Sequence, residues 1–265
     1  MSPQFVKPYV KSNKHDAADA EASCEAVIRP AMRFVAVKSV EQQDILAIHR
    51  IRSGLVQRRT ALANQIRGLL GEYGIIVPQG INKLREQLPL ILEDAENGLT
   101  SLGRELFAEL YEQLKDVDKH VKCYDVKLAQ LCQQSEVCQR LTQMPGVGAL
   151  SATALVASVG NAHVFKNGRQ MSAWLGLVPR QHSSGGKSLL LGISKRGDCY
   201  LRTLFIHGAR AALTHVNKRE NSQNKWLKSL IERRGQNKAC VALANKNARI
   251  AWSLIAKGTC YQPVI

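Results

Sequence analysis

A run of apolar residues between positions 107 and 131 commits this stretch of the chain to one long helix. Successive members of the run lie alternately three and four residues apart, which places them all on one side of a helix. The spacing holds for about three and a half heptads, the pattern of a coiled-coil seam. The seam consists of Phe107, Leu110, Leu114, Val117, Val121, Tyr124, Leu128 and Leu131.

A second long helix is predicted from Val40 to Tyr73, because apolar residues recur there every seven positions while arginines occupy the other faces. Gly74 and Pro78 end it. The seam then has two candidate partners: this arginine-rich helix of the same chain, or the seam of a second chain. The spacing fits both, so intramolecular packing and a homo-oligomer stay open. The recurring residues are Ile48, Leu55, Leu62 and Leu69.

Positive charge is concentrated in the second half of the chain. Residues 1–140 carry 19 basic and 18 acidic side chains, whereas residues 141–265 carry 18 basic and three acidic ones, a net charge of +15. Such a half repels itself unless a polyanion neutralises it, and this favours a nucleic acid as partner. The alternatives are a merely soluble basic surface, a membrane-surface protein and a ribosomal type of protein.

Several classes of protein are disfavoured by the sequence. The longest weakly polar stretch, residues 149–160, is too short to span a bilayer, and residues 1–19 lack the apolar core of a secretory signal. The seven cysteines form no Cys-x-x-Cys pair, which argues against a zinc ribbon or a disulfide framework. We therefore expect a cytoplasmic protein with reduced thiols and no membrane partner.

The fold class predicted is mostly α, in three segments. Residues 1–39 should hold a helix from His15 to Ile28 and a short strand from Met32 to Val37, a broken α/β remnant. Residues 40–140 form the long helix and coiled-coil arm. Residues 141–265 form a basic helical domain, with residues 176–197 predicted as a glycine- and serine-rich loop. Helices in this domain are expected at about 148–158, 167–175, 198–216, 222–234 and 237–257.

The turn Met144-Pro145-Gly146-Val147-Gly148 precedes a helix of small residues. It resembles the hairpin of a helix-hairpin-helix element, in which glycines permit a tight turn and backbone amides face a phosphate. Gly146 and Gly148 are therefore candidate nucleic-acid-binding positions. The alternative is a glycine turn between two packed helices.

Two further motifs place hydroxyl groups near positive charge. In the segment 180–187, Ser183 and Ser184 precede two glycines, with Arg180 and Lys187 on either side. His182 lacks a nearby carboxylate to orient it, so a Ser-His-Asp triad is not supported, and the residues alone favour a phosphate-binding loop.

The segment Ile193-Ser194-Lys195-Arg196-Gly197-Asp198 leads into a helix that begins after Asp198, a candidate cap. Lys195, Arg196 and Arg202 are expected to contact phosphates. The alternative is a capped and solvated basic helix.

Asp16 and Asp19 lie three residues apart, so their carboxylates share one face of the predicted amino-terminal helix. Two carboxylates are a poor site for Mg²⁺, and metal-dependent nucleases use more. On its own, the pair is more typical of charge that complements a helix dipole.

In this order along the chain, the motifs resemble the insertion-sequence 110 family of transposases, in its 1111-like branch. The segments that carry the resemblance are Asn-x-x-Asp-x-x-Asp-Ala, the arginine helix, the heptad arm, Pro-Gly-Val-Gly, Gly-Leu-Val-Pro-Arg with Ser-Ser-Gly-Gly, and Ile-Ser-Lys-Arg-Gly-Asp. The resemblance covers essentially the whole chain. It implies a RuvC-like (ribonuclease-H-like) domain with four acidic metal ligands, a coiled-coil arm, and a transposase domain with a nucleophilic serine.

By position, the resemblance implies roles for three residues. Asp16 and Asp19 match the last two acids of the metal-binding quartet, which would hold Mg²⁺, and Ser184 matches the nucleophile, with Ser183 the lesser candidate. The implied activity is the cutting and rejoining of insertion-element DNA, guided by an RNA of the element.

The chain departs from this pattern at its start, where 15 residues without an acid precede Asp16. We therefore expect a truncated RuvC-like domain and a catalytically incomplete chain. Two other functions stay open: a non-catalytic nucleic-acid-binding relic, and a self-associating helical protein.

Overall fold

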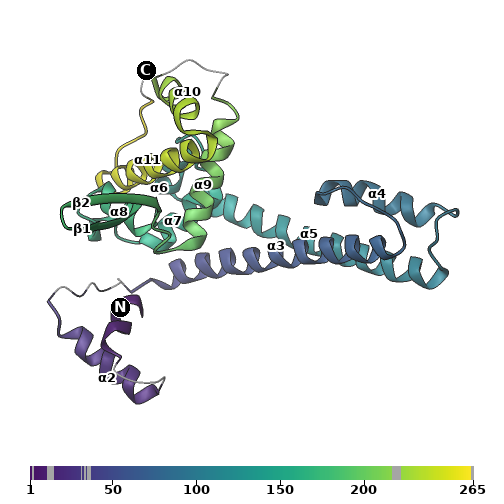
Figure 1. The fold of residues 1–265 in the computed structure, drawn as a ribbon, viewed down its shortest axis with the longest axis horizontal. Coiled ribbons are helices and arrows are strands. Elements are labelled where there is room, and N and C mark those ends of the chain that lie inside the picture. Colours follow the sequence, from purple (N-terminus) through teal and green to yellow (C-terminus); the bar gives the residue numbers. More distant parts are fainter. Residues whose placement is uncertain are drawn as a thin grey trace. The chain divides into compact units, whose positions relative to one another are not determined.

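A computed structural model describes residues 1, 3–10, 15–30, 32, 34, 37–216 and 222–263 (Figure 1). It is mostly helical and divides into two compact units, Met1–Ser39 and Val40–Ile265.

The amino-terminal unit contains α1 (Pro3–Val6), a short 3₁₀ turn (Lys7–Tyr9) and α2 (Asp16–Val27). The expected helix is confirmed: the Ala17 amide donates to Nδ1 of His15 at 3.1 Å, which caps α2. Ala22 and Ala26 are its buried residues.

The expected strand at Met32–Val37 is not found in the part of this segment that the structure describes. Residues 31, 33, 35 and 36 lie outside the described residues, and Met32, Phe34 and Val37 are in no strand. Phe34 and Val37 are exposed, at 63% and 96%. Alternation predicts a strand only where a neighbouring strand can pair with it, and none of the described residues supplies one here.

Three helices form the arm: α3 (Val40–Glu72), α4 (Ile81–Glu93) and α5 (Ser101–Gln134). α3 and α5 lie side by side along most of their length, with α4 against their far end (Figure 1). The side chain of Thr100 caps α5 by accepting from the Gly103 amide. A core fills the far end of the arm and includes Ile66, Leu70, Leu84, Leu88, Phe107 and Leu114.

The heptad seam is occupied within the chain. Its most deeply buried members lie on the side of α5 that packs against α3, and three ion pairs cross between the arm helices. Arg52 pairs with Asp125, and Asp118 pairs with Arg59 of α3 and with Arg85 of α4. Of the two arrangements that the spacing allowed, the structure shows intramolecular packing. The buried members are Phe107, Leu114, Val117, Val121 and Leu128.

The rest of the unit is a cluster of helices around α11, which packs against α6, α8, α9 and α10. The helices expected after residue 147 are confirmed. The elements are α6 (Glu136–Thr142), α7 (Ala149–Val159), α8 (Gly168–Trp174), β1 (Pro179–Ser184), β2 (Lys187–Ile193), α9 (Cys199–Leu213), α10 (Ser222–Arg234) and α11 (Gln236–Lys257), with a 3₁₀ turn at Ala162–Val164. All seven cysteines are free thiols. No helix among the described residues is long and apolar enough to cross a membrane.

A buried histidine fastens the arm to this cluster. His49 of α3 is 1% exposed; its Nδ1 lies 2.9 Å from the Tyr200 hydroxyl and its Nε2 lies 3.0 Å from the Thr153 hydroxyl. The Thr153 hydroxyl donates to the Ala149 carbonyl at 2.7 Å, so it accepts from Nε2–H, and Tyr200 donates to Nδ1. Burial, and then the positive charge of Arg52, lower the pKa of His49 from 6.5 to about 4.

Replacing Val121 with lysine should lower the free energy of unfolding by about 3 kcal/mol, because a charge would enter the α3–α5 contact. Val126→Lys is the matched control, since Val126 lies on the same helix and is 56% exposed; it should cost less than about 0.5 kcal/mol. Urea unfolding monitored by circular dichroism measures both. Equal losses, or a Val121→Lys variant that keeps its stability but changes oligomeric state in sedimentation, would contradict intramolecular packing.

Acidification should remove stability through His49. The unfolded histidine takes up a proton near pH 6.5, whereas the folded one does so near 4, so stability present above 6.5 is lost as the pH falls toward 4. Between pH 7 and 4.5, the wild-type chain should lose about 2 to 3 kcal/mol more than His49→Gln. His120→Gln, the same change at an exposed position of α5, is the matched control for the loss of a histidine. Parallel curves for the wild type and His49→Gln would sink the assignment.

Candidate nucleic-acid interface and serine hairpin

The turn between α6 and α7 is held by backbone geometry. Gly146 has a φ of +83°, and the Val147 amide donates to the Met144 carbonyl at 3.0 Å. Asn247 of α11 donates to the Pro145 carbonyl at 2.9 Å, which fixes the turn from the other side. Gly148 is exposed at the start of α7, where no side chain caps the helix.

Gly146 is accounted for by packing. A Cβ at Gly146 would lie 2.5 Å from the Gly208 carbonyl oxygen of α9, and a Cβ at Gly208 would lie 1.8 Å from the Gly146 carbonyl oxygen. Neither position accepts a side chain without a shift of backbone. This close approach matches the simpler alternative, a glycine turn between packed helices, while Gly148 is exposed and stays a predicted binding position.

The expectation of an irregular loop at residues 176–197 is wrong. β1 and β2 form an antiparallel hairpin with Ser184 paired to Lys187. Gly185 and Gly186 have φ values of +56° and +77°, as both central residues of a type I′ turn require. The signal was present in the sequence, because two glycines between short runs, one of them Leu189-Leu190-Leu191, are typical of this hairpin.

The register of the hairpin separates the two serines. Residues that pair across an antiparallel ladder share a face, so Ser184 lies with Lys187, and His182 joins them from two positions earlier on β1. Ser183 lies on the opposite face, where its hydroxyl accepts from Nε2 of Gln181 at 2.8 Å.

The hairpin is exposed along both strands, with Leu189 at 58% and Leu190 at 62%. It contains Arg180 and Lys187 and no carboxylate. Of the residues after 140 that the structure describes, Asp198 and Glu232 alone have acidic side chains. The hairpin therefore presents a serine hydroxyl on a surface with positive charge.

The base of the hairpin rests on a second set of close backbone contacts. A Cβ at Gly176 would lie 2.1 Å from the Arg196 carbonyl oxygen, and one at Gly197 would lie 1.8 Å from the Trp174 carbonyl oxygen. The Ser194 amide donates to the Val178 carbonyl at 2.8 Å. These contacts hold the turn before β1 against the turn after β2.

Arg202 belongs to this base. It is only 9% exposed, and its Nη1 lies 3.3 Å from the carbonyl oxygens of Leu175 and Arg196. Buried donors need such partners, so the side chain is explained by the fold and the structure gives no support to phosphate binding by Arg202. The charge alone gave no means of telling this arginine from its exposed neighbours.

The segment from Ile193 to Asp198, just before Arg202, contains the other candidate residues of this motif. Lys195 and Arg196 are exposed, and Lys195 has a φ of +54° with its amide 3.3 Å from the Gly176 carbonyl oxygen. Asp198 caps α9 by accepting from the Leu201 amide at 3.0 Å. Lys195 and Arg196 thus lie just before the start of α9, next to the hairpin base.

Asp16 and Asp19 lie exposed in the first turn of α2, in the amino-terminal unit. Asn13, the first residue of their motif, lies outside the described residues. Within the described part of the chain, no group of three or more histidine, cysteine, aspartate or glutamate side chains could hold a metal ion. These residues therefore do not by themselves fit the Mg²⁺ site that the family resemblance implies.

Sequence reasoning missed three basic residues that line a groove beside α11: Arg169, Lys246 and Arg249. The spacing of Lys246 and Arg249, three apart on one helix, places them on one face and was the available signal.

Comparisons with known proteins agree on one family. Residues 138–226 match the family described as transposase IS116/IS110/IS902. The transposase for insertion sequence element IS1111A of Coxiella burnetii is 53% identical over 262 residues, which cover 99% of this chain and 72% of that protein. A probable family 20 transposase of Pseudomonas aeruginosa is 48% identical (99% and 78% covered), and the transposase for IS1328 of Yersinia enterocolitica is 39% identical (98% and 77%).

Proposed function

The chain belongs to the IS116/IS110/IS902 family of transposases, and we propose that it binds insertion-element DNA through its basic half and presents Ser184 as the nucleophile for cutting and rejoining. The observation that carries this proposal is the hairpin: Ser184 is exposed beside a two-glycine turn, on the face that carries Lys187 and His182.

The distribution of acidic partners along the chain supports a nucleic acid as the ligand. In the arm, Arg52, Arg59 and Arg85 pair with aspartates of α5. After residue 140, Asp198 is engaged as a helix cap. The basic residues around the hairpin thus have few acids to neutralise them, and phosphates are the groups that they fit. An RNA of the element is proposed as a second ligand of the same surface.

Arg180, Lys187, Lys195 and Arg196 are proposed to bind backbone phosphates around the scissile bond. Exposed Gly148, at the start of α7, is proposed to admit a further phosphate close to the backbone. We also propose that the α6–α7 turn acts as a helix-hairpin-helix element.

The chemical step proposed is transesterification. The Ser184 Oγ attacks phosphorus, an Oγ–P bond forms, and the bond from phosphorus to one deoxyribose oxygen breaks, with that oxygen taking up a proton. The serine proton passes to a base, and His182 on the same face is a candidate, since a neutral imidazole nitrogen can accept a proton. The DNA stays linked to the protein, so the reverse attack can rejoin it.

The family resemblance adds Mg²⁺, held by acidic residues that include Asp16 and Asp19, to neutralise phosphate charge. The described residues do not complete such a site. We propose that this chain alone is catalytically incomplete on natural DNA.

A substrate with an activated leaving group isolates the role of the serine. A duplex with one bridging phosphorothiolate needs less help at the leaving atom, and the wild-type chain should release thiol from it slowly while becoming linked to DNA. Ser184→Ala should lose this reaction. Ser183→Ala is the matched control, because Ser183 lies on the other face, and it should keep the reaction.

Gel shift under denaturing conditions and mass spectrometry of the adduct give the readout. Reaction that survives in Ser184→Ala would overturn the nucleophile. An adduct formed on unmodified DNA with Mg²⁺, and lost in Ser184→Ala, would overturn the proposed incompleteness. Binding without reaction in any variant would favour the non-catalytic nucleic-acid-binding alternative.

A further inference from the structure

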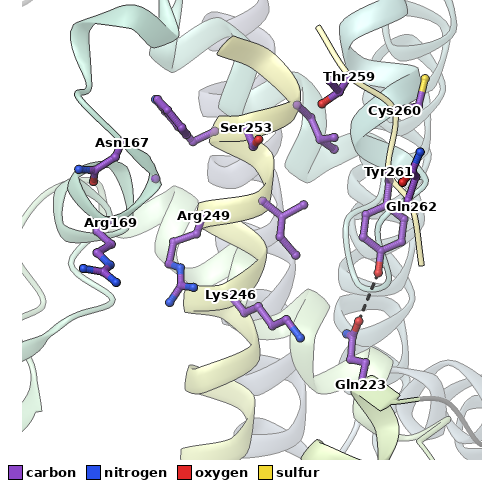
Figure 2. Close-up of a pocket in the computed structure, with 14 residues that line it drawn as sticks. Asn167, Arg169, Gln223, Lys246, Arg249, Ser253, Thr259, Cys260, Tyr261 and Gln262 are labelled. Atoms are coloured by element: carbon purple, nitrogen blue, oxygen red, sulfur yellow. Dashed lines mark hydrogen bonds between the residues drawn. The ribbon is translucent and has the colours of Figure 1, made fainter. Parts of the chain in front are cut away.

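A groove of about 680 Å³ lies between the second half of α11 and the segment that follows this helix (Figure 2). Its walls are the start of α8, the second half of α11, Gln223 of α10 and the segment Thr259–Gln262. Pockets of this size hold small organic ligands or one unit of a polymer.

The walls are fixed by specific contacts. A Cβ at Gly168 would lie 2.7 Å from the Arg249 carbonyl oxygen, so glycine lets α8 approach α11 and brings Arg169 near Arg249. On the opposite wall, the Tyr261 hydroxyl donates to Oε1 of Gln223 at 3.2 Å (Figure 2). The groove is thus formed by the fold.

The lining is cationic. Arg169 and Arg249 are exposed, and Lys246 lies between them and Tyr261, with its Nζ 4.9 Å from the centre of the Trp226 ring. None of the residues that line the groove is acidic. Two guanidinium groups beside an ammonium group favour an anion, and a guanidinium group can bind phosphate through two parallel hydrogen bonds.

The lining also contains the aromatic and hydrogen-bonding groups that a nucleobase needs. Tyr261 and Trp252 contribute aromatic surface, and the amides and hydroxyls of Gln223, Ser253 and Thr259 can donate and accept hydrogen bonds. A paired base is stacked inside its duplex and cannot enter a groove of this kind, whereas an unpaired base can stack on an aromatic ring.

We propose that this groove binds one unpaired nucleotide of a nucleic-acid strand, with its phosphate on Arg169 and Arg249 and its base against Tyr261. The inference rests on the proposed function, because it assigns a second contact to the same nucleic-acid ligand. It places single-stranded nucleic acid, from RNA or from opened DNA, on α11.

Fluorescence anisotropy with labelled 12-nucleotide single strands of RNA and DNA, and with the DNA duplex, tests the site in the full chain. Arg249→Gln should weaken single-strand binding about tenfold. Lys238→Gln is the matched control, since Lys238 is an exposed basic residue at the start of the same helix and outside the groove; it should change binding less than twofold.

Substitutions of Tyr261 distinguish the contribution of base stacking from that of positive charge. Tyr261→Leu should weaken single-strand binding about tenfold and leave duplex binding within twofold, whereas Tyr261→Phe should bind like the wild type. A 5-iodouracil in the single strand should cross-link, under light, to the peptide that contains Tyr261. The RNA and DNA probes show which strand the groove prefers.

The groove assignment would be overturned if Arg249→Gln and Tyr261→Leu bound single strands within twofold of Lys238→Gln, or if cross-links formed only in other peptides. Binding of the duplex would in that case still uphold the proposed function. Absence of binding to every probe by the wild type would overturn both. Displacement of the oligonucleotide by polyglutamate at equal charge would assign the groove to an acidic peptide instead.

Discussion

The unequal partition of charge is the constraint from which the functional interpretation follows. In the arm, aspartates of α5 neutralise arginines of α3 and α4, and Asp118 serves two of them. After residue 140 the chain has 18 basic and three acidic side chains. Internal pairing on that scale is impossible there, so the charge repels itself until a polyanion binds. Arginines of the arm thus find acidic partners within the chain, whereas the helical cluster has few acids to offer, and this difference supports the proposed polyanionic ligand.

Close backbone contacts determine where that charge lies. Gly146 meets Gly208, and Gly176 and Gly197 meet the backbone of Arg196 and Trp174. The first of these contacts sets a turn against α9, and the other two join the turn before β1 to the turn after β2 and to the end of α8, so the exposed residues of these turns are held in place by close backbone packing. Buried Arg202 closes the hairpin base with its two carbonyl contacts. The two-glycine turn that carries Ser184 then projects into solvent from an anchored base.

The sequence predicted what periodicity and charge determine: the long helices, the cap at Asp198 and the basic half. It left the partner of the seam open, because spacing shows which side of α5 is buried and not what buries it. The strand predicted at Met32–Val37 is not seen at the residues of this segment that the structure describes, where no neighbouring strand is available to pair with it. The hairpin was missed because its glycines and serines were interpreted as loop composition, although two adjacent glycines also fit a type I′ turn. The partners of Arg202 and the walls of the groove beside α11 depend on contacts between distant segments, although the spacing of Lys246 and Arg249 did indicate one basic face of that helix.

The salt dependence of duplex DNA binding by the full chain tests most directly whether the basic half acts through phosphates. Between 50 and 200 mM salt, the logarithm of the association constant should fall linearly with the logarithm of the salt concentration, because bound phosphates release counterions. Arg196→Gln, at an exposed position beside the hairpin base, should reduce the slope by about one. An affinity that stays flat across this range, or a slope that Arg196→Gln leaves unchanged, would contradict the account.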